Sequence, residues 1–105
     1  MEKAENTILG KWQQMKGQPF EGLWFEFFED GSFKAAYPEM GVTSSGKYSY
    51  SGDLINLNQT QHTLGLVGVF EGRFKIEANV LRLSLSDAGE KAPENLSKAR
   101  NYIKQ

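Results

Sequence analysis

The aromatic residues of this chain have a spacing that could form a binding site. Several of them are tyrosines, whose hydroxyl groups can form hydrogen bonds. Where such rings alternate with polar residues, they fall on one face of an extended strand. The rings that we expect to face inward are Phe25, Phe27, Tyr37, Tyr48, Tyr50 and Phe74. An apolar pocket with a few polar groups is typical of a site for a small organic molecule. These rings therefore predict a ligand pocket whose polar groups are tyrosine hydroxyls.

The same rings could instead fill the interior and leave no pocket. An eight-stranded barrel is just wide enough to be filled by side chains or to hold one small ligand. A chain of 105 residues has short strands, which favours a filled or nearly filled interior. Whether the rings line a cavity or occupy it decides between a ligand-binding protein and a module with a solid core.

The other residues that could do chemistry form no catalytic or metal-binding pattern. His62 is the only histidine, and it lies in a polar stretch, residues 59–63, that we expect to be an exposed loop. Ser44 lacks the strand–elbow–helix context of a hydrolase nucleophile. The acidic pairs lie in turn sequences, and a chain without cysteine has neither a thiol nucleophile nor a zinc–cysteine site. We therefore expect no enzyme activity, no metal and no cofactor.

Length and composition limit the remaining classes of protein. A length of 105 residues predicts one domain, residues 1–105. A net charge of −1 gives no basic surface for nucleic acid or anionic membranes, and we find no apolar run of about 18 residues that could span a bilayer. The compartment stays open: the chain would be cytoplasmic if it is complete and exported if a leader had been removed.

The elements that would position these side chains are short β-strands, in which apolar and polar residues alternate. Asp30-Gly31 between two apolar runs is a strong hairpin signal, because glycine adopts a positive φ without steric cost. The expected strands are residues 8–14, 23–29, 33–37, 46–50, 54–58, 64–77, 80–86 and 99–104. Eight strands close a small barrel, so the sequence predicts an all-β fold, a single antiparallel up-and-down β-barrel.

For three segments, the sequence is compatible with more than one local structure. Residues 94–104 place apolar residues at helical spacing, but a final strand is favoured because the first strand otherwise lacks a partner. Residues 2–7 could form a helical turn. Gly68 and Gly72 interrupt the longest apolar run and indicate a bend or a bulge.

Several short motifs occur in an order that suggests a family. Leu9-Gly10-Lys11-Trp12 places a Gly-x-Trp in the first strand, and residues 27–33 contain the Asp-Gly hairpin. Residues 68–70 and 76–83 form a second hairpin pattern, which a proline-containing loop at residues 89–93 follows. In this order the motifs resemble those of small bacterial lipocalin-like domains of the calycin type, most of them of uncharacterised function. The resemblance covers nearly the whole chain.

The resemblance implies roles for residues near both ends of the chain. Gly10 would permit close strand packing, and Trp12 would plug one end of the barrel. Arg100-Asn101-Tyr102 resembles the Arg-x-Tyr with which fatty-acid carriers bind a carboxylate, and two such side chains share one face of a strand. Alternatively, Arg100 would be exposed or would pack across the Trp12 indole, as an arginine near the chain end does in lipocalins. We favour these structural roles for Arg100.

The chain departs from the related families at two places. Fatty-acid-binding barrels insert two lid helices after the first strand, whereas only Met15 to Glu21 separates the first two strands here, so no helical lid is expected. The glycine that is usual in the late hairpin is replaced by Ala78-Asn79, where asparagine could adopt the positive φ.

These observations together predict a lipocalin-like domain that binds a small hydrophobic or amphipathic ligand, mainly by burying the ligand's apolar surface. The alternative from another class is a protein-interaction or inhibitory module with a solid core. Its surface would include Trp24 and Phe28, which lie opposite the main apolar face of their strand.

Overall fold

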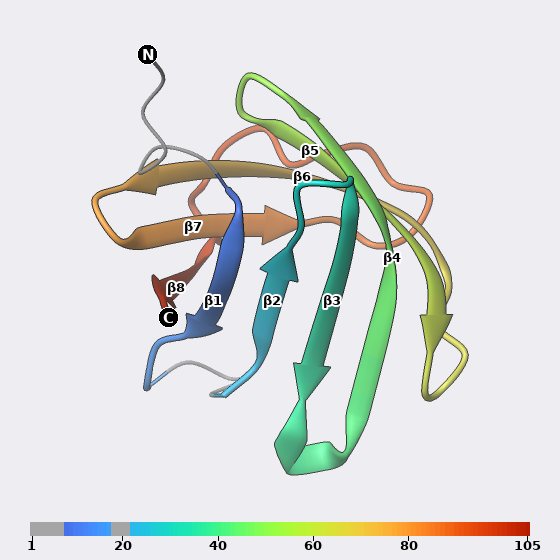
Figure 1. Ribbon diagram of the computed structural model, residues 1–105. Coiled ribbons are helices and arrows are strands. Elements are labelled where there is room, and N and C mark those ends of the chain that lie inside the picture. The colour runs from blue at the N-terminus through green and yellow to red at the C-terminus, as the bar shows by residue number, and fades with distance from the viewer. Residues whose placement is uncertain (1–7, 18–21) are drawn as a thin grey trace.

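In the computed structural model, which describes residues 8–17 and 22–105, the chain forms one closed barrel of eight antiparallel strands (Figure 1). Each strand pairs with the next one in the chain, and β8 pairs with β1. The strands are β1 (Gly10–Gln14), β2 (Trp24–Phe27), β3 (Ser32–Tyr37), β4 (Val42–Ser51), β5 (Leu54–His62), β6 (Gly68–Glu77), β7 (Val80–Leu85) and β8 (Arg100–Lys104). The 3-10 turn η2 (Pro38–Met40) joins β3 to β4. The predicted all-β, up-and-down barrel is confirmed.

Apolar and polar residues alternate along the strands, so that each strand contributes one row of apolar side chains to the barrel interior. Trp12 lies opposite Phe25 in the β1–β2 pair, and Phe25 lies opposite Ala35 in the β2–β3 pair. On the other side of the barrel, Leu81 lies opposite Ile76 and Tyr102. Residues directly opposite each other in antiparallel strands project to the same face, so this register builds a continuous apolar interior.

The Asp-Gly hairpin between β2 and β3 forms as predicted. Gly31 has a φ of 90°, and its N–H donates to the Phe28 carbonyl at 3.1 Å. The Asp30 carboxylate accepts a hydrogen bond from the Ser32 N–H at 2.9 Å. The turn at Ala78-Asn79 differs from the expectation, because the residue with positive φ is Ala78, at 54°. An alanine in this conformation costs about 1–2 kcal/mol.

The β1–β8 pair closes the barrel and settles the alternatives for residues 94–104. Trp12 lies opposite Lys104 and Gln14 lies opposite Tyr102, so residues 100–104 form the favoured strand. Residues 86–99 form turns and irregular structure. The connection from β1 to β2 spans residues 15–23, which is too short for two lid helices. The helical turn considered for residues 2–7 lies outside the described residues.

The long strands β4, β5 and β6 differ from their predicted limits. β5 continues to His62, so the loop predicted for residues 59–63 is wrong. The reason is that this end of β5 carries glutamine and threonine, and no apolar alternation marks it. β6 begins only at Gly68 because Gly65 and Gly68, with φ of 80° and 142°, bend the chain before it. β6 then continues through Gly72.

The register shift in these strands lies elsewhere, between Ser45 and Gly46 of β4. Gly72 instead allows a close approach, because it pairs with Ile55 on one side and with Leu85 on the other. A β-carbon at Gly72 would lie 2.7 Å from the Ser84 carbonyl oxygen.

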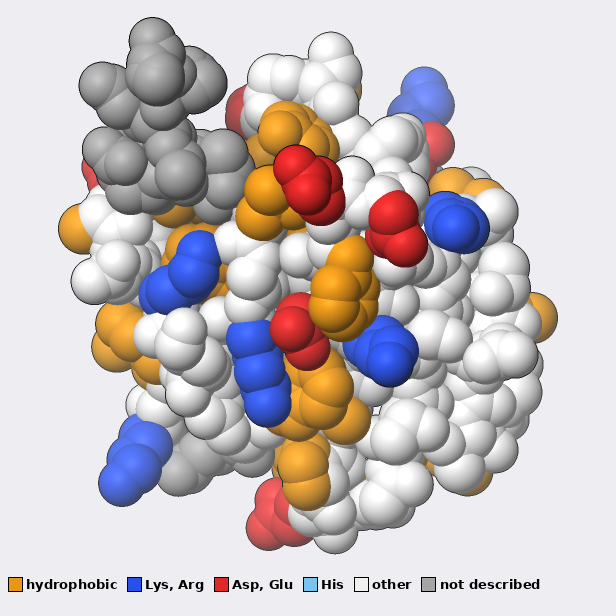
Figure 2. Space-filling view, viewed as in Figure 1, with side chains coloured by type: hydrophobic (Ala, Val, Ile, Leu, Met, Phe, Trp, Pro, Cys, Tyr) orange, Lys and Arg blue, Asp and Glu red, His pale blue; other side chains and the backbone are white. Residues whose placement is uncertain are grey.

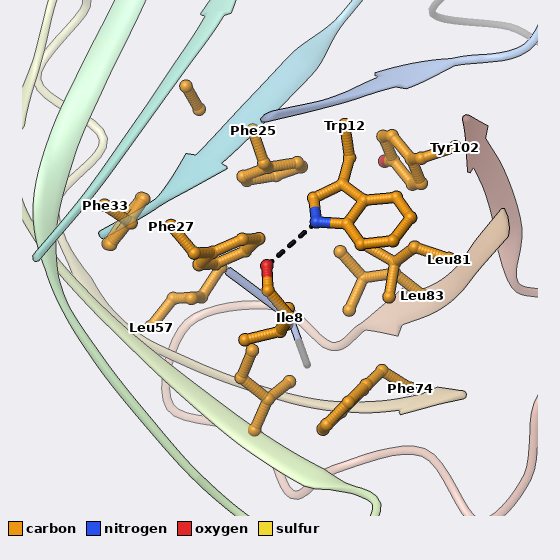
Figure 3. Packing of buried hydrophobic residues seen from close by; sticks show 12 residues of the cluster. Ile8, Trp12, Phe25, Phe27, Phe33, Leu57, Phe74, Leu81, Leu83 and Tyr102 are labelled. Carbon is orange, nitrogen blue, oxygen red and sulfur yellow. Dashed lines mark hydrogen bonds between the residues drawn. The ribbon is translucent and has the colours of Figure 1, made fainter. Parts of the chain in front are cut away.

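The centre of the barrel is filled by side chains (Figure 3). Its largest members, Ile8, Trp12, Phe27, Phe33, Ile55 and Leu81, are each less than 2% exposed. A void that could hold a water molecule would leave accessible surface on the side chains around it, and these have almost none. The Trp12 indole N–H is satisfied in this packing by the Ile8 carbonyl, at 2.8 Å. The part of the interior around these residues is therefore solid.

Residues 8–17 and 22–105 contain no helix that is long and apolar enough to cross a membrane.

Candidate functional site

A hollow of about 650 Å³ lies at the end of the barrel where β1 ends, β2 begins, β7 ends and β8 begins. We call it the β7–β8 hollow. Its apolar walls are Leu23, Phe25, Leu83 and Leu85, and its polar walls include Gln14, Ser84, Ser86, Arg100 and Tyr102. Part of the β7–β8 connection, from Pro93 to Lys98, lines the remaining side. The hollow arises because β8 pairs with β7 only as far as Leu83, which leaves the end of β7 without a neighbour on that side.

Arg100 brings a positive charge to this hollow. Its guanidinium has no hydrogen bond or ion pair with any residue that the structure describes, and the residue is half-buried. The exposed side chains of Lys98 and Glu94, of opposite charge, lie on the loop side of the hollow. A guanidinium without a partner beside an apolar wall is suited to a carboxylate, sulfate or phosphate group, which it can bind with two parallel hydrogen bonds.

Tyr102 lies beside Arg100 on the inward face of β8 and is 4% exposed. Its hydroxyl accepts a hydrogen bond from Gln14 Nε2 at 3.4 Å, across the β1–β8 pair. Burial raises the pKa of Tyr102, while the hydrogen bond from Gln14 and the charge of Arg100 act in the opposite direction. The hydroxyl therefore stays protonated at neutral pH, and it can donate a hydrogen bond to a ligand.

Six of the eight residues predicted to bind a ligand form one uninterrupted series of ring contacts. It runs in the order Tyr102, Phe25, Phe27, Tyr48, Tyr50 and Phe74, with centroid distances of 5.7, 5.9, 5.0, 6.4 and 5.7 Å. Only its first two members line the β7–β8 hollow. Together with Arg100, they are the predicted residues that the structure brings to this site.

The other predicted residues lie away from the hollow. Phe27 and Phe74 belong to the buried core. The Tyr48 hydroxyl donates to the Phe28 carbonyl at 2.9 Å, and Tyr50 is 50% exposed near the β4–β5 turn. The Tyr37 hydroxyl donates to the Glu39 carboxylate at 2.9 Å in an exposed position at the end of β3.

The cation that packs across the Trp12 indole is Lys104 and not Arg100. Its ammonium lies 4.8 Å from the centroid of the Trp12 ring and donates to the Leu9 carbonyl at 2.7 Å. The absence of a side chain at Gly10 makes room for it, because a β-carbon there would lie 2.8 Å from Lys104 Nζ. The close packing predicted for Gly10 therefore involves the lysine side chain. This arrangement leaves Arg100 free to face the hollow.

Sequence reasoning missed most of the hollow, including Gln14, Leu23 and the β7–β8 connection. One signal was available: Gln14 shares the inward face of β1 with Trp12, and a polar residue at such a position marks a barrel mouth or a polar site. The position of residues 93–98 depends on contacts with distant strands, which no local pattern encodes.

Trp24 and Phe28, the two aromatic residues predicted to face outward, each lie beneath a lysine side chain. The Lys11 ammonium lies 4.3 Å from the centroid of the Trp24 ring, and the Lys34 ammonium lies 5.9 Å from that of Phe28. Glu26 lies opposite both lysines in the register of β1, β2 and β3. Figure 2 shows basic and acidic side chains among the apolar ones on this face of the molecule. Both rings are half-buried and form no open apolar patch.

His62 lies in β5 and is half-buried, with its Nδ1 accepting a hydrogen bond from the Leu64 N–H at 3.0 Å. Among the described residues, no group of three or more His, Asp or Glu side chains is placed to hold a metal ion.

Comparison of the chain with protein-family models, with curated proteins and with solved structures found no match.

Proposed function

We propose that this chain is a lipocalin-like binding protein, without enzyme activity, whose ligand is a small amphipathic molecule with an anionic head group. The observation that carries the proposal is the Arg100 guanidinium, which has no partner among the described residues and lies at a hollow with apolar walls. The Tyr102 hydroxyl would donate a second hydrogen bond to the same head group. Leu23, Phe25 and Leu83 would cover the apolar part of the ligand.

The size of the hollow limits the ligand. About 650 Å³ lies within the range of roughly 300–1,000 Å³ that is usual for small-molecule sites. The packed core around Phe27 and Phe33 gives a long chain no room to extend into the barrel centre. We therefore expect a ligand with a short or compact apolar part, held at the mouth of the barrel.

The test compares octanoate with octanol, which has the same chain length but no charge, by isothermal titration calorimetry. We expect Arg100→Met to weaken octanoate binding about tenfold or more, since a hydrogen bond to a charged group contributes about 1.5–3 kcal/mol. Octanol binding should be unchanged. Lys91→Met is the matched control, because it removes the same charge from an exposed position of the β7–β8 connection that does not line the hollow.

Two results would count against the proposal. One is an octanoate affinity that Arg100→Met and Lys91→Met change equally, and the other is no octanoate binding to the unmodified protein. Native mass spectrometry of freshly purified protein identifies the natural ligand if one copurifies.

A further inference from the structure

Exposed apolar side chains gather in three connections on one side of the barrel. These are the β1–β2, β3–β4 and β5–β6 connections, which leave the barrel in the same direction (Figure 1). Their exposed members are Met15, Met40, Leu64, Leu66 and Val67, which are between 41% and 65% exposed. Three of the five lie within the β5–β6 connection, and exposed apolar side chains that occur together, unlike those scattered singly, indicate an interaction surface.

The β5–β6 connection carries three of these five side chains, and we call this connection together with the first two residues of β6 (residues 63–69) the apolar tip. It carries Leu64, Leu66, Val67 and Val69, all exposed. No lysine, arginine, aspartate or glutamate occurs from residue 54 to residue 70. The tip itself therefore carries no acidic or basic side chain of these four types. The nearest charged residues belong to the start of the β7–β8 connection, where the Gly89 N–H donates to the Val69 carbonyl at 3.1 Å, and they include both signs, Glu90 and Lys91.

The base of the apolar tip is fixed to β4. The Thr63 N–H donates to the Thr43 carbonyl at 3.0 Å, and the Thr43 N–H donates to Thr63 Oγ1 at 2.8 Å. The Leu64 N–H is held by His62 Nδ1. These bonds fix the base of the tip relative to β4, and the apolar side chains beyond this base are exposed to solvent.

We propose that the apolar tip, together with Met40 and Met15, docks this end of the barrel on the surface of an electrically neutral lipid bilayer. The apolar residues occupy separate connections. A protein partner would need a complementary recess for each projection, whereas a fluid bilayer accepts separate projections without one. The lack of charge from residue 54 to residue 70 matches a neutral interface. The exposed charged residues next to Met15 and Met40 are Lys16 and Glu39, which have opposite signs, so the docking surface gives no net attraction to anionic lipids.

Docking would also bring the β7–β8 hollow toward the lipid. Gln14 and Leu23, which line the hollow, stand where β1 ends and just before β2 begins, at the base of the β1–β2 connection. The docking proposal does not depend on ligand binding, because its residues and those of the hollow are different. A protein that binds no octanoate could still bind vesicles.

The test is flotation of the purified protein with phosphatidylcholine vesicles. We expect the unmodified protein to bind and added salt to leave binding nearly unchanged, because neither the neutral lipid nor the apolar tip carries a net charge whose attraction ions could screen. The double variant Leu64→Asp/Leu66→Asp should lower the partition coefficient at least about tenfold, since charge on an inserted surface opposes burial in lipid. Leu54→Asp, an exposed leucine at the opposite β4–β5 turn, is the matched control and should bind normally.

Three results would overturn the proposal. The first is no binding of the unmodified protein to the vesicles, and the second is equal binding by the double variant. The third is a dimer, measured by analytical ultracentrifugation, that the double variant abolishes while neither protein binds vesicles. In that case the surface covered by the apolar tip belongs to a second copy of this chain.

Discussion

The different positions of Lys104 and Arg100 lead to a prediction about which cation stabilises the fold. Both lie on β8 and face the same side of the strand. Lys104 donates to the Leu9 carbonyl and lies over the Trp12 ring, whereas Arg100 has no polar partner among the described residues. We therefore expect Lys104→Met to destabilise the protein and Arg100→Met to leave its stability nearly unchanged.

The magnitude follows from the contacts that Lys104 loses. A hydrogen bond from a charged group contributes about 1.5–3 kcal/mol, and a partly exposed cation–π contact contributes about 0.5–1 kcal/mol. Methionine keeps most of the apolar stem, so its packing on Trp12 is largely retained. We expect Lys104→Met to lower the free energy of unfolding by about 2 kcal/mol, which for a domain of this size is a fall in Tm of about 10 °C. For Arg100→Met we expect a change within about 0.5 kcal/mol.

The assay is urea unfolding followed by tryptophan fluorescence, with calorimetry for Tm. Trp12 is buried next to Lys104, so its emission also reports whether the variant keeps the native packing. Equal destabilisation by the two variants, or an unchanged free energy of unfolding in Lys104→Met, would refute the assignment of Lys104 as the residue that covers Trp12.

Three further changes test other parts of the structure by urea unfolding. Ala78→Gly should raise the free energy of unfolding by about 0.5–1 kcal/mol, because glycine relieves the strain of a positive φ; a loss of stability would contradict the turn geometry. Gly72→Ala should lower it by about 1–3 kcal/mol, because the new methyl group meets the Ser84 carbonyl oxygen, and an unchanged value would show that β6 can move. Burial raises the pKa of Tyr102 above its ordinary value of 10.0, so the folded state keeps a proton that the unfolded state loses. Stability should therefore fall as the pH rises above about 10, and Tyr102→Phe should reduce that fall; an identical pH dependence in this variant would contradict the effect of burial.

The sequence predicted the parts of the fold that depend on local signals. Asp30-Gly31 places a turn because the φ that glycine permits is the one a tight hairpin needs. The alternation around Phe25 and Leu83 identifies inward positions, since the side-chain period of a strand is two residues. The end of β5 was missed because glutamine and threonine stand on both faces of it, and hydrogen bonds to β4 decide its conformation.

The candidate site could be predicted only in part. Arg100 and Tyr102 were candidates because Arg100-Asn101-Tyr102 resembles the Arg-x-Tyr of fatty-acid carriers, and Phe25 was a candidate because of its alternation. Packing across Trp12, one of the two roles favoured for Arg100 over ligand contact, belongs to Lys104. The register of β1 against β8 decides which residue faces Trp12, and that register is a long-range property. The walls of the β7–β8 hollow also depend on long-range pairing, because they come from four strands and two connections.

The pairing of β1 with β8 also has a kinetic consequence. The Gln14–Tyr102 hydrogen bond joins residues 88 positions apart, so this pair closes the longest loop of the barrel and orders more chain than any hairpin. We expect the β1–β8 pair to form after the rate-limiting step of folding, because the entropy of such a closure is lost before its contacts stabilise the chain. Mutations there would accelerate unfolding and leave the folding rate unchanged. The lifetime of the folded barrel would then depend on the stability of this one pair of short strands.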